Sequence, residues 1–245
     1  MRLLGLVACR TGSSRLPGKA FRELGGVPLL GRVLDRVTAG VAFGEVVVCT
    51  TVDPADDAIE EYCAGRGVAV HRGPVEDVLG RFLGAMESRP SEYVARITGD
   101  NPLSDVPAML GALGHLERTG GDYSRPDGVP LGCAIEVARA DALRELHERT
   151  LAPELTEYMT WFFELAPFVR CELWPAPDEV RFPDLRLTVD LESDLAFLER
   201  VLAHFGGVFP PLPEIVAYCR TLDDAPRVAR DPAAEAAVRD RIRFA

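Results

Sequence analysis

Residues 8–19 of the chain are Ala8-Cys9-Arg10-Thr11-Gly12-Ser13-Ser14-Arg15-Leu16-Pro17-Gly18-Lys19, a polar loop between two apolar segments. The run 3–8 before it is typical of a buried strand, and residues 29–37 after it carry apolar side chains at helical spacing. A strand, a loop and an amphipathic helix in this order open an α/β unit, in which ligands bind beyond the carboxyl ends of the strands. The loop is therefore predicted to lie at the ligand-binding edge of a sheet.

The loop concentrates positive charge and hydrogen-bond donors. Arg10, Arg15 and Lys19 lie within ten residues of one another, although the formal net charge of the chain is -11. Small residues that let backbone N–H groups approach an anion, or that donate through a hydroxyl, are Gly12, Ser13, Ser14 and Gly18. The alternative is a solvated surface loop, but the position after a strand and the density of cations favour a bound polyphosphate.

The spacing of the loop excludes two common phosphate-binding motifs. A P-loop has four residues between its glycines and a Ser or Thr after its lysine. Here five residues separate Gly12 from Gly18, and Ala20 follows Lys19. The dinucleotide fingerprint is also missing, because no glycine follows Gly12 two residues later.

The pattern Ala-x-Arg-x-Gly-Ser-x-Arg-Leu-Pro-Gly-Lys at residues 8–19 resembles the opening signature of the cytidylyltransferases that make CMP-activated sugar acids. Within that superfamily it looks most like the branch named after spore-coat polysaccharide biosynthesis. The resemblance covers roughly residues 3–205 and is firm over the first 105. It implies a three-layer α/β/α, Rossmann-like nucleotidyltransferase fold of the GT-A type with a mostly parallel central sheet. The implied reaction transfers CMP from CTP to a small acceptor and releases pyrophosphate.

Length and composition indicate a single globular domain over residues 1–245. We expect a nucleotide-binding half (1–105), an acceptor-binding half (106–205) and a C-terminal helical appendage (206–245). The pI near 4.9 argues against a nucleic-acid partner, and no apolar run is long enough to span a membrane. The first residues predict a strand instead of a signal peptide. Six scattered cysteines favour reduced thiols and a cytoplasmic location.

Strand and helix signals alternate through the first half, which predicts a mainly parallel sheet with helices on both faces. The predicted strands are 3–8, 45–50, 67–70 and 92–97, and the predicted helices are 29–37, 53–63, 77–86 and 106–117. In the second half we expect strands at 133–137, 169–174 and 186–189, and helices at 141–148, 154–165 and 191–205. The loops after the first, second and fourth strands should converge at one edge.

Two aspartates are suited to a divalent metal ion. A nucleoside triphosphate carries about four negative charges, and Mg²⁺ prefers one or two carboxylates together with phosphate oxygens. Asp100 follows a strand in Thr98-Gly99-Asp100, and Asp190 ends a strand just before a helix. Asp100 could instead be a turn residue, and Asp190 could instead be the N-cap of the helix that follows it. Both segments resemble the family's metal-binding elements.

The resemblance assigns roles to individual residues of the nucleotide site. It implies that Asp100 and Asp190 hold Mg²⁺, and that Lys19, Arg10 and Asp100 carry out catalysis. The residues expected to bind the nucleotide are Arg10, Thr11, Gly12, Ser13, Arg15, Lys19, Thr50, Arg72 and Arg96. Arg81 matches a segment that the family carries near the nucleotide, although a helix-face charge is an equal alternative. Arg96 could equally reach the site or pair with a core acid.

The second half departs from the family pattern where the acceptor should bind. Leu131 and Ala134 stand where the family normally carries an arginine and an aspartate, and Tyr158 replaces a histidine in Glu157-Tyr158-Met159-Thr160. These differences suggest a less anionic or bulkier acceptor. Glu136, Glu157 and Tyr158 are the candidate acceptor residues. Glu136 could instead be a surface charge at the end of a strand.

Other functions are compatible with parts of the sequence. A sugar-phosphate nucleotidyltransferase is the closest alternative, but its loop has a longer gap between arginine and lysine. A glycosyltransferase would need an Asp-x-Asp turn, which Thr98-Gly99-Asp100-Asn101-Pro102 lacks. A nucleotide-binding regulator without activity is the alternative from another class. The family resemblance also implies a homodimer.

Overall fold

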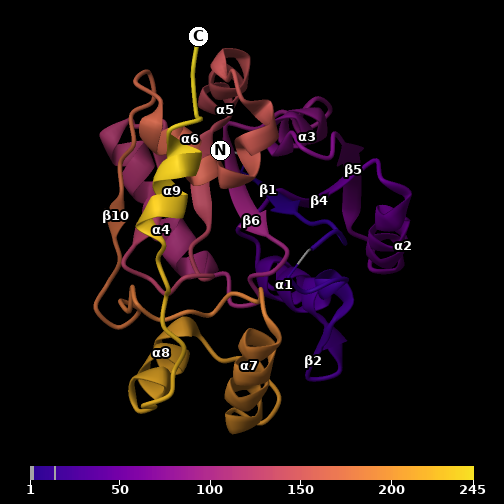
Figure 1. The fold of residues 1–245 in the computed structure, drawn as a ribbon, viewed down its shortest axis with the longest axis vertical. Coiled ribbons are helices and arrows are strands. Elements are labelled where there is room, and N and C mark those ends of the chain that lie inside the picture. Colours follow the sequence, from indigo (N-terminus) through magenta and orange to yellow (C-terminus); the bar gives the residue numbers. More distant parts are fainter. Residues whose placement is uncertain (1–2, 14) are drawn as a thin grey trace.

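A six-stranded sheet forms the centre of the computed structural model, which describes residues 3–13 and 15–245, so Ser14 lies outside the described residues (Figure 1). The strand order is β5-β4-β1-β6-β9-β7. The strands are β1 (Leu3–Ala8), β4 (Glu45–Thr51), β5 (Ala69–Gly73), β6 (Tyr93–Thr98), β7 (Tyr123–Ser124) and β9 (Glu136–Arg139). Strands β5, β4, β1 and β6 pair in parallel, and β9 pairs antiparallel with both β6 and β7, so five of the six strands run in the same direction. The predicted, mostly parallel sheet is confirmed.

Helices cover both faces of this sheet. They are α1 (Leu29–Thr38), α2 (Asp57–Gly65), α3 (Val78–Met86), α4 (Val106–Thr119), α5 (Ala140–Arg149) and α6 (Met159–Leu165). Side chains of β1 alternate between the faces, as the strand period requires. Leu3 and Val7 pack with α1, α2 and α4, whereas Leu4 and Leu6 pack with α3, α5 and α6. The three-layer α/β/α architecture is therefore confirmed.

A third apolar cluster lies beyond the end of the sheet, around α7 (Glu192–His204) and α8 (Leu212–Arg220) (Figure 1). It includes Leu198 and Ile215 and reaches back to Leu16 in the loop after β1. Two short hairpin strands, β2 (Glu23–Leu24) and β3 (Val27–Pro28), lead from that loop into α1. In the described part of the chain, no helix is long and apolar enough to cross a membrane.

Several predicted elements of the second half are different in the structure. The strand expected at 133–137 is β9 and begins at Glu136. The run 169–174 contributes only to β10 (Trp174–Pro175), which pairs with β8 (Pro126–Asp127). Residues 186–189 form no strand, because their backbone N–H groups donate to loops: Leu187 to Leu131 and Val189 to Asp100.

The helix expected at 154–165 divides into a 3-10 turn (Pro153–Tyr158) and α6. The Thr156 side chain accounts for this, because its hydroxyl donates to the carbonyl of Pro153 and accepts from the backbone N–H of Val78. Such local bonds compete with regular helix geometry. Glu157 and Tyr158 are consequently positioned on a turn. The other 3-10 turns are Lys19–Phe21 and Pro54–Asp56.

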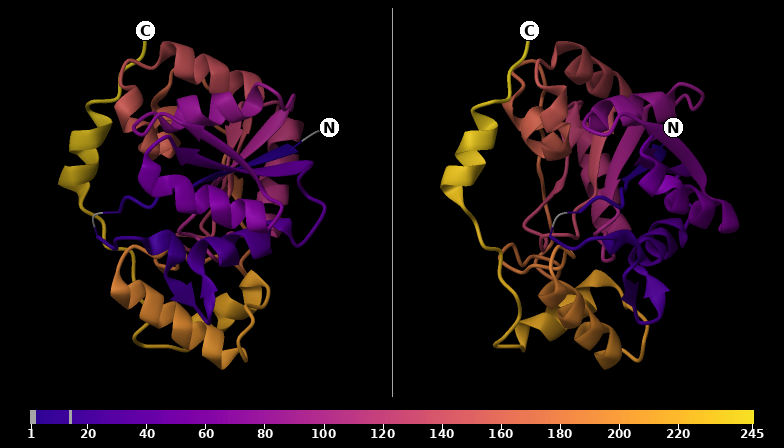
Figure 2. Two further views of the ribbon diagram at one scale, coloured as in Figure 1. Left: turned by 90° about the vertical axis from the view of Figure 1, so that its right-hand side faces the viewer. Right: turned by 45° about the vertical axis from the view of Figure 1, so that its right-hand side comes forward.

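The C-terminal arm, residues 228–245, connects two distant parts of the molecule. Its helix α9 (Pro232–Arg239) has no buried residue and runs along the outside from the α8 region toward α5 and α6 (Figure 2). Beyond α9, Ile242 is buried and Phe244 makes edge contacts with Phe162 and Phe168. The arm is therefore held by its ends, while α9 between them packs into none of the three cores.

Candidate functional site

A cleft of about 640 Å³ opens where the loops after three parallel strands meet. The loops follow β1, β5 and β6, and residues 157–158 and Asp190 close the cleft from the second half of the chain. Convergence of the loops after the first and fourth predicted strands is confirmed. The loop after β4, the second predicted strand, also meets the loop after β1, because Thr11 donates to Asp56, but the cleft itself is lined by residues 75–78 after β5 instead.

Lys19 brings the two predicted metal-binding aspartates together. Its Nζ atom lies 2.6 Å from Oδ2 of Asp100 and 3.1 Å from Oδ1 of Asp190, and it also donates to the carbonyl of Val189 at 3.4 Å. Asp100 belongs to the loop after β6, and Asp190 precedes α7. The two aspartates are separated from Lys19 by 81 and 171 positions in the sequence, yet they meet at its ammonium group. Lys19 is also the sole lysine in the 245-residue sequence, whose other basic residues are arginines.

Asp190 is not the N-cap of α7. Leu191 is the N-cap, and Asp194 in the first turn of α7 accepts through its Oδ2 from the backbone N–H groups of Asp190 (2.8 Å) and Leu191 (2.9 Å). Arg186 connects the two carboxylates, lying 2.7 Å from Oδ2 of Asp190 and 3.0 Å from Oδ1 of Asp194. The side chain of Asp190 is thereby held toward Lys19, with Oδ1 accepting from Lys19 and Arg15 and Oδ2 accepting from Arg186.

This network keeps both carboxylates ionised. Burial alone would raise the pKa of the Asp190 carboxyl, but the charge of Lys19 and the hydrogen bond from Arg186 hold it below its ordinary value. Burial would likewise raise the pKa of Asp194, but the hydrogen bonds and charge of Arg186 and the backbone N–H groups of Asp190 and Leu191 together lower it. Arg186 and Asp194 are absent from the predicted site. Their signal in the sequence is the four-residue spacing of opposite charges at 186, 190 and 194.

The loop after β1 presents its small residues to the cleft but turns Thr11 away from it. Gly12 and Ser13 line the cleft, whereas the backbone N–H and the hydroxyl of Thr11 both donate to Oδ1 of Asp56 at 2.7 Å. The other oxygen of Asp56 accepts from the backbone and hydroxyl of Thr51. Thr11, predicted to bind nucleotide, instead anchors the loop to the start of α2. Asp56 is a missed positioning residue, because Asp53-Pro54-x-Asp56 is also the pattern of an ordinary helix start.

Arg10, Arg15 and Arg96 reach the cleft as predicted, each paired with an acid. Arg10 lies 3.3 Å from Oε2 of Glu157, and Arg15, exposed to 63%, lies 3.0 Å from Oδ1 of Asp190. Both positions predicted as alternatives for Arg96, at the site and beside a core acid, are occupied by the same side chain. It lines the cleft, and its Nη1 lies 2.9 Å from Oε1 of the buried Glu136.

Three predicted contacts are corrected by the structure. Thr50 is fully buried in β4, and Arg72 on β5 turns to the α2 face, where it pairs with Asp57 at 2.6 Å. Strand alternation explains both, because these side chains point to the face opposite to the one that carries α3. Glu136 lies behind the cleft wall, where Arg96 and the hydroxyl of Thr160 occupy Oε1.

Arg81 is the most unusual side chain of the cleft. It comes from the first turn of α3, lines the cleft and is only 3% exposed, and its Nε and Nη1 have no hydrogen-bond partner among residues 3–13 and 15–245. Its burial lowers the pKa of the guanidinium. Burying an unpaired charge costs several kcal/mol, so an anionic or hydrogen-bond-accepting ligand is the natural partner for these donors.

The cleft contains a thiol that stays neutral. Cys9 lines it between β1 and the cationic loop, and burial, followed by the negative charge of Asp100, raises the pKa of the thiol far above its ordinary value. A thiol that is not ionised is a poor nucleophile and a poor metal ligand. Cys9 is therefore assigned a packing role, and covalent catalysis through it is disfavoured.

Two carboxylates of the cleft, Asp100 and Asp190, lie close enough together to share one ammonium group. In residues 3–13 and 15–245, no group of three or more His, Cys, Asp or Glu side chains could hold a metal ion. Asp100 and Asp190 match the one or two carboxylates that Mg²⁺ takes when phosphates and waters complete its shell. The donor set therefore fits a divalent metal ion that binds together with a phosphate ligand.

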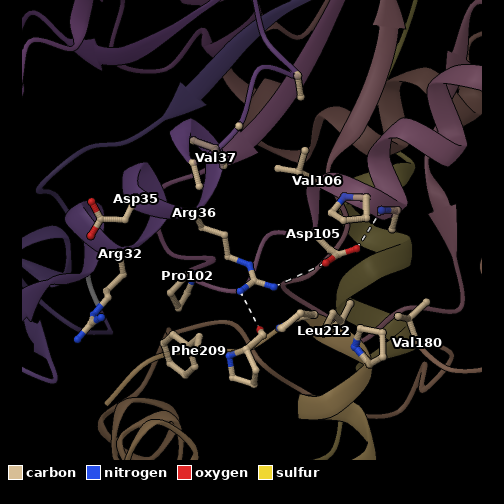
Figure 3. Close-up of a pocket in the computed structure, with 18 of the residues that line it drawn as sticks. Arg32, Asp35, Arg36, Val37, Pro102, Asp105, Val106, Val180, Phe209 and Leu212 are labelled. Atoms are coloured by element: carbon tan, nitrogen blue, oxygen red, sulfur yellow. Dashed lines mark hydrogen bonds and ion pairs between the residues drawn. The ribbon is translucent and has the colours of Figure 1, made fainter. Parts of the chain in front are cut away.

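A second, apolar cavity of about 790 Å³ lies between α1, the start of α4 and the segment before α8 (Figure 3). Its central cation, Arg36, donates to the carbonyl of Ser104 at 3.0 Å and to that of Pro210 at 3.3 Å, and lies 3.6 Å from Asp105. The walls are mostly apolar, and proline and valine are the commonest residues in them. This cavity is larger than the cleft. Because Arg36 is already paired, the cavity is less suited than the cleft to a polyphosphate.

Comparison with known proteins agrees with the chemistry of the cleft. A family model described as cytidylyltransferase matches residues 4–171. The spore coat polysaccharide biosynthesis protein SpsF of Bacillus subtilis (strain 168) is 33% identical over 212 residues, which are 83% of this chain and 88% of that protein.

Solved structures show the same fold. A cytidylyltransferase from Leptospira borgpetersenii is 26% identical, with a TM-score of 0.81 over 90% of this chain and 94% of that one. A CMP:2-keto-3-deoxy-manno-octonic acid synthetase complexed with CTP has a TM-score of 0.63 at 17% identity. That match covers 84% of this chain and 100% of the synthetase, and it supports the fold alone.

Proposed function

Because the chain belongs to the cytidylyltransferase family, we propose that it transfers CMP from CTP to a small acceptor and releases pyrophosphate. The observation that carries this proposal is the meeting of Lys19 with Asp100 and Asp190 in a cleft that also holds the unpaired Arg81. We propose a sugar acid or a related hydroxy, phospho or phosphonate compound as the acceptor, and the names of relatives that act on 3-deoxy-manno-octulosonate support the sugar acid.

In this proposal, the triphosphate lies along the loop after β1. Arg10, Arg15 and Lys19 carry the charges that oppose its phosphates, and backbone N–H groups near Gly12 and Ser13 add hydrogen bonds. Their present partners are carboxylates, so the phosphates would replace one set of anions with another. Asp56 keeps the loop in this position through Thr11.

Asp100 and Asp190 would hold Mg²⁺, which neutralises charge on the phosphate oxygens when it is bound. Arg186 keeps Asp190 turned toward Lys19, so it acts as a positioning residue for this pair. Lys19 would then be shared between the carboxylates and a phosphate oxygen. A small, three-donor ammonium group suits such shared contacts better than a planar guanidinium.

We assign the inner end of the cleft to the nucleoside. Its lining from Val75 to Arg81 combines apolar contacts with unused guanidinium donors. The faces of a pyrimidine ring suit contact with the valines, and a carbonyl oxygen of the ring can accept hydrogen bonds from Arg81. This takes the place of the base contacts predicted for Thr50 and Arg72.

In the reaction, an acceptor oxygen attacks the α-phosphorus in line, a new P–O bond forms, and the bond to the pyrophosphate oxygen breaks. Lys19 and Arg10 stabilise the charge that develops on the phosphates. Binding of the triphosphate would withdraw Arg10 from Glu157. The carboxylate of Glu157 is then free to accept a hydrogen bond from the acceptor.

The decisive measurement is pyrophosphate release with each of the four ribonucleoside triphosphates against panels of sugar acids, sugar phosphates and phosphonates. We expect release with CTP and loss of it in Lys19→Ala. A variant of the exposed Arg200–Asp224 pair, Arg200→Gln, is the matched control, since this pair belongs to α7 and the segment after α8. Release with another nucleotide but not CTP would contradict the proposal.

A second test uses the sole lysine. An amine reagent can modify only Lys19 and the α-amino group, so the extent of labelling at Lys19 reports directly on the cleft. We expect CTP to protect Lys19. Labelling that is indifferent to CTP and to every other nucleotide would favour a different ligand.

We also propose that residues 1–245 form one domain, that the protein works in the cytoplasm and that it is a homodimer. The continuous contact between the α7–α8 cluster and the loop after β1 supports the single domain. Light scattering tests the dimer, and a monomer at all concentrations would contradict it.

A further inference from the structure

The acceptor side of the cleft carries an aromatic platform made of Tyr158 and Trp161. The two rings are stacked, with centroids 5.1 Å apart and planes 5° from parallel. Tyr158 lines the cleft and is 37% exposed. Because one face of its ring is covered by Trp161, the exposed surface belongs to the opposite face and the edge.

The C-terminal arm supports this platform from behind. The guanidinium carbon of Arg239, the last residue of α9, lies 5.7 Å from the centroid of the Trp161 ring. Arg239 also pairs with Glu164 at 3.5 Å, one turn further along α6 from Trp161. A cation near an aromatic ring and an ion pair on the same helix fix the orientation of Trp161, and with it that of Tyr158.

The charges beside the platform are unfavourable to an anionic acceptor. Glu157 precedes Tyr158 and is anionic, and Arg10 is its partner at 3.3 Å. Arg96 is engaged by Glu136 and by the carbonyl of Glu157 at 3.2 Å. Once the triphosphate takes Arg10, the charge next to Tyr158 is negative.

We propose that Tyr158 and Glu157 form the acceptor subsite, and that the acceptor is an uncharged polyhydroxylated compound, a carbohydrate or polyol. This inference rests on the proposed function and narrows its acceptor class. The C–H face of the acceptor stacks on Tyr158, as apolar sugar faces do on aromatic rings, and one hydroxyl donates to Glu157. An acceptor carboxylate would face Glu157, and the two cations that contact Glu157 among the described residues, Arg10 and Arg96, already pair with carboxylates.

The transfer balances with such an acceptor. The hydroxyl oxygen of the acceptor forms the bond to the α-phosphorus of CTP, and the bond from the α-phosphorus to the β-phosphate oxygen breaks. The hydroxyl proton passes to Glu157 or to water, and pyrophosphate leaves. The product is a CMP diester of the alcohol.

The test uses Trp161 as the reporter. The chain has two tryptophans, so Trp174→Phe leaves Trp161 as the single fluorophore, directly under Tyr158. Matched probes of equal carbon skeleton are titrated with CTP present: ribitol against ribonate, and glucose against glucuronate. We expect the neutral member of at least one pair to change the fluorescence emission of Trp161 in a saturable way. The carboxylate member of the same pair is expected to bind at least roughly tenfold more weakly.

Variants of the platform make the test specific. Tyr158→Ala is expected to weaken binding of the neutral probe roughly tenfold, whereas Tyr158→Phe, which keeps the ring, retains it. Pyrophosphate release should show the same pattern as an increase of KM in Tyr158→Ala. The inference would be overturned if the carboxylate probes bound more tightly than the neutral ones, or if no neutral probe changed the emission. It would also be overturned if Tyr158→Ala bound the neutral probe as tightly as the wild type does.

Failure of this inference and failure of the proposed function give different results. A wild-type protein that does not bind CTP contradicts the proposed function. A protein that binds CTP, releases pyrophosphate and prefers the carboxylate probes contradicts only the neutral acceptor.

Discussion

The ammonium group of Lys19 lies 2.6 Å from Oδ2 of Asp100, at the point where the loops after β1 and β6 meet. Both side chains are largely buried, with 17% and 24% of their surfaces exposed. The chain uses arginine at every other basic position, so the one lysine marks a place where arginine does not suffice. The four predictions below concern this contact and the groups that support it.

Replacing Lys19 should abolish turnover whichever residue replaces it. We expect Lys19→Ala to lower kcat/KM about a hundred- to a thousandfold, because one preorganised charge at the phosphates is lost. Lys19→Arg should be nearly as inactive, since a planar guanidinium cannot contact Asp100, Asp190 and a phosphate as a point charge does. Steady-state pyrophosphate release measures both. Rescue by Lys19→Arg would show that only the charge matters.

Arg81→Met should stabilise the protein while weakening nucleotide binding. The guanidinium is buried with two unpartnered nitrogen atoms, so a methionine of similar length removes a desolvation cost. We expect a higher Tm and at least about tenfold weaker CTP binding, with tripolyphosphate binding unchanged. Arg36→Met is the matched control, because Arg36 is paired with Asp105 and its loss should lower Tm. A lower Tm in Arg81→Met would indicate a structural role for Arg81.

Asp56→Ala should loosen the phosphate-binding loop. The carboxylate accepts from the backbone and the hydroxyl of both Thr11 and Thr51, and it is 1% exposed. Leaving buried donors without a partner costs about 1–3 kcal/mol each, so we expect denaturant unfolding to show a loss of about 3 kcal/mol. CTP binding should weaken as well. Its exposed neighbour provides the control, since Asp57→Ala should change stability by about 0.5 kcal/mol or less.

Arg186→Met should destabilise the protein most at neutral pH. Arg186 lowers the pKa values of Asp190 and Asp194, so its stabilisation is fully present above their unfolded pKa of about 3.9 and is lost as pH falls through the lowered folded values. We expect a difference from wild type of about 3 kcal/mol at pH 7 that shrinks as the pH falls below about 4. Urea unfolding at several pH values measures it. A difference that is constant with pH would mean that Arg186 acts by packing alone.

Much of the nucleotide half could be predicted because its signals are local. Alternating apolar runs and helical stripes define the strands and helices through residue 119, and the turns after β1 and β6 carry distinctive residues. Asp190 follows residues 186–189, which form no strand, so its position depends on loop-to-loop backbone bonds. Lys19 and Asp100 could be brought together from sequence because their loops follow β1 and β6. The carboxyl ends of parallel strands share one edge of a sheet, so such residues converge.

The failures have two physical causes. The directions of Thr50 and Arg72 depend on strand parity: in a strand, a shift of one residue moves a side chain to the other face. The second half is held by loop-to-loop backbone bonds, such as Val189 to Asp100, which leave no periodic pattern in the sequence. Arg186 and Asp56 were hidden for a related reason, because each acts through a neighbour instead of facing the cleft.

The way in which the C-terminal arm is attached has a consequence for how this protein can diversify. Its helix α9 contributes nothing to the three cores, yet its last residue sits behind the ring that supports Tyr158. Changes in the length or sequence of α9 would therefore tilt the acceptor wall without disturbing the nucleotide pocket. Acceptor preference can therefore change through substitutions in α9 that leave the three cores intact. The C-terminal arm is the segment to replace or shorten when a new acceptor is wanted.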